Sequence, residues 1–213
     1  MDAEFTVLDG LPAGHRVGFF ATPRNYQASI RFANAGSATD RDADIRGLSV
    51  RVMGVEGVNL TTGATVHDFI LNSHPVMMVP GAREFLDLLQ ANEAGGFRRI
   101  MYFLSHPGAA RVAGAARTHP TCHLDLTYWS TTPYLFGPQR AVKYIVAPAS
   151  MQRSPMPPAR TDSSLLDAMR TRLGAGEAVF DFMIQFQTDA RRMPIEDASV
   201  EWKRQDSPYV PVA

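Results

Sequence analysis

The segment spanning residues 66–80, VHDFILNSHPVMMVP, most constrains how this chain can fold. Its first half is rich in β-branched and aromatic residues, which favours a β-strand. Proline lacks a backbone donor and moves the residue before it away from helical geometry, so His74 and Pro75 predict a bend near the strand end. Binding groups are often displayed at such bends, and Asn72 would lie there. The alternative is a buried strand whose polar end is satisfied by backbone hydrogen bonds.

Several other segments have the composition of strands. In residues 177–187, three phenylalanines and an isoleucine alternate with more polar residues, which predicts a strand with one strongly apolar face. Further strands are predicted at residues 3–8, 16–21, 28–33, 47–53, 122–131, 142–146 and 200–202. Turn-rich segments join the first of these strands, which predicts a β-meander.

Helical periodicity occurs in two parts of the chain. After the first apolar strand segments, helices are predicted at residues 82–92, 97–105 and 108–117. A later helix begins after Asp162 or Ser163, either of which can cap its free amides, and it ends at Gly174. Residues 147–160 contain four prolines and predict an extended connector, which we do not expect to divide two domains.

Length and composition favour a single domain spanning residues 1–213, because 213 residues with 45% hydrophobic content can bury a sizeable core. Lysine and arginine balance aspartate and glutamate at 21 each, so no electrostatic field favours nucleic acid or an anionic membrane. Cys122 is the single cysteine, which rules out an internal disulfide. Since no apolar run reaches membrane-spanning length and the acidic first residues do not resemble a secretory signal, we expect a soluble cytoplasmic protein.

Common catalytic motifs are absent from the sequence. The six histidines do not have the spacing of a zinc motif, so no metal site is predicted. No Gly-x-Ser-x-Gly elbow or glycine-rich phosphate loop occurs. Arg31 and Arg46 each lie beside apolar residues, where a charge needs an anionic partner. That partner is either an aspartate such as Asp44 or the carboxylate of a ligand.

Three successive segments resemble motifs of the haem catalase superfamily, with similar order and spacing. They are residues 30–34 (IRFAN), 44–52 (DIRGLSVRV) and 68–76 (DFILNSHPV). Later segments are similar to further blocks of that fold: Tyr128-x-Ser130-x-Thr132, residues 141–144 (AVKY), residues 184–187 (IQFQ), Trp202 and residues 207–212 (SPYVPV). The resemblance covers nearly the whole chain. It is closest to the short catalase-related proteins, to which residues 3–7 and 194–198 are also similar.

The resemblance implies roles for three residues at a cofactor. Asn72 falls on the distal asparagine that positions peroxide, and Arg31 falls on an arginine that pairs with a haem propionate. Peroxide cleavage needs polar groups that move a proton between the two oxygens, and a dianionic cofactor needs arginines beside its propionates. Phe85 corresponds to an aromatic residue packed against the distal haem face.

The same resemblance assigns three further residues to a substrate channel. Met77 and Met78 take the place of a phenylalanine pair, which implies a more flexible channel because methionine is unbranched and adaptable. Asp44 matches an aspartate near that channel, where it would steer a polar substrate.

The chain also departs from the family pattern. The family's distal histidine lies before the motif that contains residues 3–5, and its proximal tyrosine, the axial ligand of the iron, lies after the block that contains residues 210–212. Both positions fall outside this sequence, so we expect a core domain that is truncated at both ends. Arg98 and Tyr102 have the spacing of the tyrosine motif but lie in another segment, and Ala33 replaces the usual serine.

From the resemblance we expect an α+β fold, an antiparallel β-barrel with inserted helices. The expected function is haem-dependent breakdown of hydrogen peroxide or an organic hydroperoxide, with haem as the cofactor and a homo-oligomer as an allowed assembly. Related small members rearrange fatty-acid hydroperoxides, which makes an allene oxide synthase-like enzyme one alternative. The other alternative is a non-catalytic barrel that binds an apolar ligand, or nothing, in the same cavity.

Overall fold

The computed structural model describes residues 1–57, 63, 65–151, 153–156 and 159–213. The strands are β1 (Asp2–Thr6), β2 (Asn25–Asn34), β3 (Arg46–Met53), β4 (Val66–Asn72), β5 (Tyr128–Trp129), β6 (Tyr134–Leu135), β7 (Ala141–Pro148), β8 (Phe180–Phe186) and β9 (Val210–Pro211). The helices are α1 (Ala82–Ala94), α2 (Gly96–Ser105), α3 (Pro107–Ala116) and α4 (Ser164–Ala175). Short 3₁₀ turns are η1 (Ala13–His15), η2 (Gly18–Ala21) and η3 (His123–Asp125).

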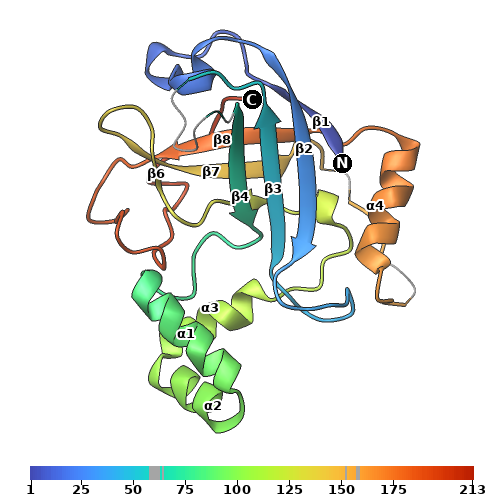
Figure 1. Cartoon of the computed structure of the whole chain (residues 1–213), viewed down its shortest axis with the longest axis vertical. Helices are drawn as coiled ribbons and strands as arrows, with labels where there is room; N and C mark the ends of the chain where they lie inside the picture. Colours follow the sequence, from blue (N-terminus) through green and yellow to red (C-terminus); the bar gives the residue numbers. More distant parts are fainter. Residues whose placement is uncertain (58–62, 64, 152, 157–158) are drawn as a thin grey trace.

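These strands form one antiparallel sheet in the order β1-β2-β3-β4-β5-β7-β8-β9, with β6 paired to β7. The sheet curls so that β2, β3 and β4 cross β7 and β8 (Figure 1). Its two ends meet just beyond the outermost strands, where the Leu8 amide donates a hydrogen bond to the Val212 carbonyl at 3.0 Å. The predicted α+β fold, an antiparallel β-barrel with inserted helices, is therefore confirmed.

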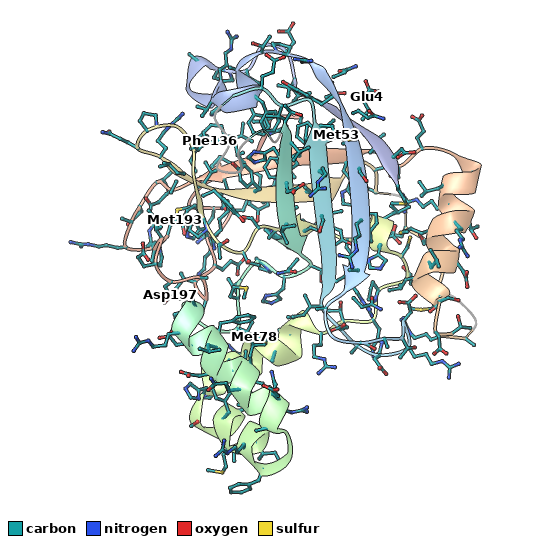
Figure 2. The ribbon with its side chains drawn as sticks, in the orientation of Figure 1. Glu4, Met53, Met78, Phe136, Met193 and Asp197 are labelled. Atoms are coloured by element: carbon teal, nitrogen blue, oxygen red, sulfur yellow. The ribbon has the colours of Figure 1, made fainter. Side chains whose placement is uncertain are left out.

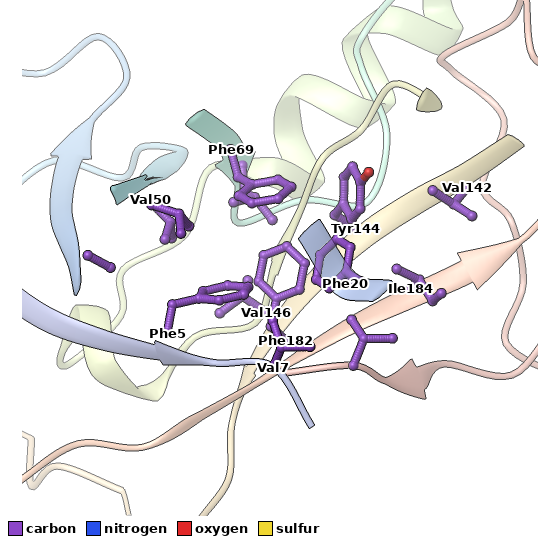
Figure 3. Packing of buried hydrophobic residues seen from close by; sticks show 14 of the residues in the cluster. Phe5, Val7, Phe20, Val50, Phe69, Val142, Tyr144, Val146, Phe182 and Ile184 are labelled. Carbon is purple, nitrogen blue, oxygen red and sulfur yellow. The ribbon is translucent and has the colours of Figure 1, made fainter. Parts of the chain in front are cut away.

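Aromatic side chains fill the interior of the barrel. The ring centroid of Phe69 on β4 lies 4.7 Å from that of Phe182 on β8 and 4.9 Å from that of Tyr144 on β7. Phe5 on β1 lies 5.1 Å from Phe182, so side chains from four strands meet (Figure 3). Ring pairs of this kind contribute about 0.5–1.5 kcal/mol each beyond the burial of their area. The inside of the barrel is thus a packed core.

α1, α2 and α3 lie together beside the barrel, and we call them the helical group (Figure 1). Their small core contains Val79, Leu88 and Ala109, and Met78 packs against it where the chain leaves the sheet (Figure 2). The two-residue alternation of β4 gives way to a helical period after Pro80, so a different face of the chain becomes apolar there. No helix in the described part of the chain is long and apolar enough to cross a membrane.

Two predicted strands are wrong. In the segment 16–21, residues 18–21 form the 3₁₀ turn η2 instead, because Gly18 has a left-handed φ of 56° that interrupts an extended backbone. Residues 200–202 do not join the sheet, since the Trp202 carbonyl accepts a hydrogen bond from a glutamine side chain of β8 at 2.9 Å. Burial of the Trp202 indole accounts for the apolar pattern that indicated a strand. Within residues 122–131, only the short strand β5 pairs with other strands, and η3 precedes it.

The N-terminus of α4 is capped by a residue that is distant in sequence. The buried Asp40 carboxylate accepts a hydrogen bond from the Leu165 amide at 2.9 Å, whereas Ser163 makes no side-chain capping bond. The predicted alternative, Asp162, is exposed and accepts from a threonine hydroxyl instead. The other oxygen of Asp40 accepts from the Asn34 side chain at 3.1 Å. The loop between β2 and β3 is thereby tied to α4.

Arg46 lies inside the fold next to this loop and is 0% exposed. Its guanidinium donates to the Asn34 side chain and to the Asp42 carbonyl. Burial lowers the pKa of Arg46, and the nearby negative charges of Asp44 and Asp40 oppose that shift. The hydrogen-bond partners of this arginine are thus an amide and a backbone carbonyl, while the two aspartates act on it as nearby charges.

His123 is a second titratable group in the interior. Its ring centroid lies 5.2 Å from that of Phe32, and its carbonyl accepts a hydrogen bond from the Tyr128 hydroxyl at 2.9 Å. Burial, together with the positive charge of Arg46, lowers the pKa of His123 to about 4. The imidazole is therefore neutral near pH 7.

Removing the distant cap should destabilise the fold more than removing the acid next to the helix. Asp40→Ala leaves the Leu165 amide and the Asn34 amide without their acceptor, so we expect it to lower the free energy of unfolding by about 2–3 kcal/mol. Asp162→Ala is the matched control, and it should change that free energy by less than about 1 kcal/mol because its ion pair is exposed. Urea unfolding of both variants measures the difference, and equal effects would contradict the assignment.

Stability should depend on pH through His123. Between pH 6.5 and about 4 the unfolded chain binds a proton at this residue and the folded chain does not. The free energy of unfolding should therefore fall as the pH is lowered through that window, by about 2–3 kcal/mol from this group. His123→Gln should flatten the profile measured by urea unfolding, while His119→Gln, at an exposed position, should leave its slope unchanged. A wild-type slope in His123→Gln would contradict the prediction.

Candidate functional site

The outer face of β2, β3 and β4 carries Arg31 and Asn72. The antiparallel register aligns residues of these strands in two rows, which we call the outer rows. One row consists of Ala33, Gly47 and Asn72, and the other consists of Arg31, Ser49 and Ile70. Directly opposed residues point to the same side of a sheet, so both rows face away from the barrel interior.

Asn72 is held at the end of β4 by the hydrogen bonds of its neighbour. The Ser73 amide donates to the Arg46 carbonyl at 2.8 Å, and the Arg46 amide donates to the Ser73 hydroxyl at 2.9 Å. On the other side Asn72 pairs with Trp129 of β5, whose indole donates to the Tyr209 hydroxyl at 3.2 Å. Among the described residues, the Asn72 side-chain amide has no hydrogen-bond partner. It can therefore bind a ligand without breaking a bond within the fold.

Arg31 differs from the other arginine on the same face. Arg51 pairs with Asp68 on the neighbouring strand through two hydrogen bonds of 2.7 and 2.8 Å. Arg31 is exposed, opposes Ser49 on β3, and makes no ion pair within the described ranges. Its guanidinium is therefore available to an external anion.

The surface between Arg31 and Asn72 is formed by short side chains and is partly apolar. Gly47 has no side chain, and a Cβ built there would meet only Ala33 and the Leu71 carbonyl, at 3.8–3.9 Å. Ile70 is 58% exposed, which is unusual for a large apolar side chain at the centre of a sheet. A flat apolar group that carries an anion could lie on these rows, with its charge at Arg31 and its face toward the Asn72 amide.

Asp44 has a structural environment. It is buried, and its carboxylate accepts hydrogen bonds from the Gly36, Ser37 and Ile45 amides at 2.8–2.9 Å. Burial by itself would raise the pKa of Asp44, but the three amides and the charge of Arg46 together hold it below its ordinary value. In this conformation the carboxylate stabilises the loop between β2 and β3. Its role at a substrate channel stays a prediction.

Met77, Met78 and Phe85 follow Asn72 along the chain and lead into the helical group. The Met77 amide donates to the Ala198 carbonyl at 3.0 Å, which fixes this connection to the C-terminal part of the chain. Met78 and Phe85 are half-buried and pack together in the core of the helical group. The structure thus brings these two residues together, while Arg31 and Asn72 share the outer face. Their roles at a channel and at a cofactor stay predictions.

The described residues contain no cluster of three or more His, Cys, Asp or Glu that could hold a metal ion. Tyr102, whose spacing from Arg98 matches the axial tyrosine motif, lies in α2. Its hydroxyl donates to the Glu84 carbonyl at 3.4 Å, and its ring packs in the core of the helical group. Tyr102 is therefore part of the core of the helical group and does not lie on the outer face with Arg31 and Asn72.

Sequence reasoning missed Gly47, Ile70 and Trp129 as members of the site. Alternation along a strand indicates that Arg31 shares a face with Ala33. Which residues of β3, β4 and β5 lie beside them depends on the inter-strand register, which alternation does not define. The glycine at position 47, the first residue of the strand predicted at residues 47–53, was the available signal, because a glycine within a strand often marks a close approach of a ligand.

No family model matches the chain, and no curated protein matches its sequence. Among solved structures, a bacterial catalase superposes with a TM-score of 0.73 at 13% identity, covering 100% of this chain and 45% of that chain. Catalase A from Saccharomyces cerevisiae gives a TM-score of 0.74 at 17% identity, covering 99% of this chain and 48% of that chain. The chain spans less than half the length of either catalase. It has the catalase fold, which confirms at the level of structure the resemblance found in its sequence motifs.

Proposed function

We propose that the outer rows form the distal wall of a haem site at which hydrogen peroxide or an organic hydroperoxide is broken down. The observation that carries this proposal is the placement of Arg31 and Asn72 on one face of the sheet, with the small residues Ala33, Gly47 and Ser49 and the exposed Ile70 making up the rest of the outer rows. The catalase fold supports it, since the two similar structures are catalases. The chain accounts for less than half of those proteins, so the activity proposed is that of a site to which this chain contributes.

The residues of the outer rows fit haem chemically. Haem is a flat apolar ring with two propionates, so it needs an even apolar surface and a cation at one edge. Ala33, Gly47 and the exposed Ile70 provide the surface. Arg31 provides the cation, and it has no competing carboxylate among the described residues.

Haem would supply a redox-active iron when bound. The chain's own contribution would be to orient the peroxide with Asn72, whose Nδ2 donates to one peroxide oxygen while Oδ1 accepts the proton of the other. An amide does not titrate near pH 7, so Asn72 would position the peroxide and would not act as its base. Arg31 would hold a propionate and so fix how the ring lies on the outer rows.

A non-catalytic barrel with an apolar ligand inside is less well supported. The interior positions of β1, β4, β7 and β8 are filled by Phe5, Phe69, Tyr144 and Phe182. A barrel of this size is closed by its own side chains when they pack in this way. The available surface is therefore on the outer face, and both the ligand and the activity are proposed there.

A side chain added at position 47 should block haem. Gly47→Leu places a branched chain in the middle of the outer rows, so we expect haem affinity to fall by about tenfold or more. A Cβ at this position meets its neighbours at ordinary contact distances, so the fold should be retained. The measurement is an absorption titration of the full chain with haem.

The matched control is Gln27→Leu, which adds the same side chain to the same face. Residue 27 lies six positions along β2 from Ala33, or about 20 Å, and should leave the affinity unchanged. Arg31→Glu should also weaken binding by about tenfold, while Arg170→Glu on α4 should not. A chain that shows no saturable change in haem absorption, or Gly47→Leu with wild-type affinity, would refute the proposal.

Loss of the Asn72 amide should lower turnover without releasing haem. In Asn72→Ala the peroxide is no longer oriented, so we expect the rate of peroxide breakdown by the haem-loaded chain to fall by about 100-fold. Haem affinity, measured by the same titration, should change by less than about twofold because the arginine and the apolar surface remain. The assay contains imidazole as an added iron ligand, because the outer rows contain no side chain that would ligate the iron. Equal rates of peroxide breakdown by the wild type and by Asn72→Ala would exclude this role for Asn72.

A further inference from the structure

Sulfur atoms are the groups of a protein that peroxide oxidises most readily, and this chain offers one cysteine and ten methionines. Cys122 is 0% exposed, and burial raises the pKa of its thiol. Since peroxide reacts with an accessible thiolate, Cys122 is a poor target. Met151 and Met156 are 88% and 68% exposed, and they are the most accessible thioethers in the described part of the chain.

Met156 differs from Met151 in its contact with an arginine. Both residues lie in the connector between β7 and α4, of which residues 149–151, 153–156 and 159–163 are described. The Arg160 guanidinium donates to the Met156 sulfur, with 3.8 Å between Nη2 and Sδ. A thioether is a weak acceptor, so this contact contributes little by itself. The Met151 side chain has no hydrogen-bond partner among the residues that the structure describes.

Arg160 is held in place by backbone carbonyls. Its Nη1 donates to the Pro120 carbonyl at 3.1 Å, and its Nη2 donates to the His119 carbonyl at 2.8 Å. A terminal guanidinium nitrogen carries two hydrogens, so the second hydrogen of Nη2 is the one directed at Met156. Within the described ranges Arg160 forms no ion pair. A stronger acceptor beside the sulfur would therefore meet a fixed cation that no carboxylate compensates.

We propose that Met156 is a site of oxidation by peroxide, and that Arg160 binds the sulfoxide that forms there. In this step a lone pair of the sulfur attacks one oxygen of hydrogen peroxide, and the O–O bond breaks. The other oxygen leaves as water with both hydrogens of the peroxide, so the thioether is oxidised by two electrons and the peroxide is reduced by two. The sulfoxide oxygen then accepts a charge-assisted hydrogen bond in place of the weak contact with sulfur.

A buried methionine shows that a hydrogen bond to sulfur does not by itself make such a site. The Thr188 hydroxyl donates to the Met193 sulfur at 3.4 Å, but Met193 is 0% exposed, so peroxide does not reach it in the folded chain. Met151 has the access without the donor, and Met193 has a donor without the access. Among the described methionines, Met156 combines an accessible sulfur with a cationic donor.

Oxidation of Met156 would tie together two parts of the chain that are distant in sequence. Arg160 already contacts residues 119 and 120, which precede η3. Met156 lies in the wall of a cavity of about 740 Å³ between the connector and α4. A sulfoxide bound to Arg160 would make this wall more polar and hold it against residues 119 and 120. The inference does not depend on haem, because peroxide reacts with the thioether directly.

The first measurement is peptide mass spectrometry of the full chain after treatment with hydrogen peroxide, with no haem added. Sulfoxide should form at Met156 and Met151 and should not form at Met193. Trypsin cleavage of the folded chain after Arg160 then reports whether the guanidinium is bound, because the protease must take up this side chain. We expect cleavage at Arg160 to be at least about threefold slower after treatment than before it.

Variants at the two exposed methionines separate this site from general oxidation of the surface. After treatment, Met151→Leu should show the same slowing as the wild type, and Met156→Leu should show none. Met156→Gln places an amide oxygen beside Arg160 and should slow cleavage without peroxide, whereas Met151→Gln should not. Circular dichroism checks that each variant is folded.

Three results would overturn the proposal. The first is a chain in which Met151 is oxidised and Met156 is not. The second is cleavage after Arg160 at the same rate before and after Met156 is oxidised. The third is slowing that persists in treated Met156→Leu. None of these results bears on haem binding, which the absorption titration measures separately.

Discussion

The inter-strand register of β2, β3 and β4 is the constraint on which the rest of the structure depends. A slip of one residue would exchange the two faces of a strand. In the observed register Leu48 and Phe69 enter the interior, while Gly47 and Asn72 stay on the outer face. Each large apolar side chain buried in this way contributes about 1.5–3 kcal/mol, so the interior face fixes the register and the outer face follows from it. The fold and the candidate site thus use opposite sides of the same three strands.

Arg46 connects these two sides with α4. Its guanidinium donates to Asn34, which donates to Asp40, the acceptor that caps the first turn of the helix. Its backbone exchanges two hydrogen bonds with Ser73, next to the proposed peroxide-binding amide. A buried arginine is retained at low energetic cost only when such partners are fixed around it. One residue therefore links the start of a surface helix to the end of a strand that displays the site.

Much of the fold could be predicted from the sequence, because strand alternation and helical periods are local signals. β8 and the three helices of the helical group agree with their predicted positions. One error arises at Trp202, where an apolar pattern that reflects burial outside the sheet indicated a strand. Another arises at α4, where the residue that caps the helix, Asp40, is distant in sequence. The motifs indicated Arg31 and Asn72, and the register that places Gly47 between their strands is a tertiary property. Alternation along one strand carries no information about its neighbours.

The separation of the two faces affects how such a chain can evolve. Positions on the outer face, such as the exposed Arg31 and the half-buried Ala33 and Gly47, contribute less to folding than the interior, so substitutions there change stability less. Selection for a folded protein would preserve the aromatic interior and would not by itself preserve the outer rows. Substitutions at a few positions of the outer rows can therefore remove the activity or change the ligand, while the fold is retained.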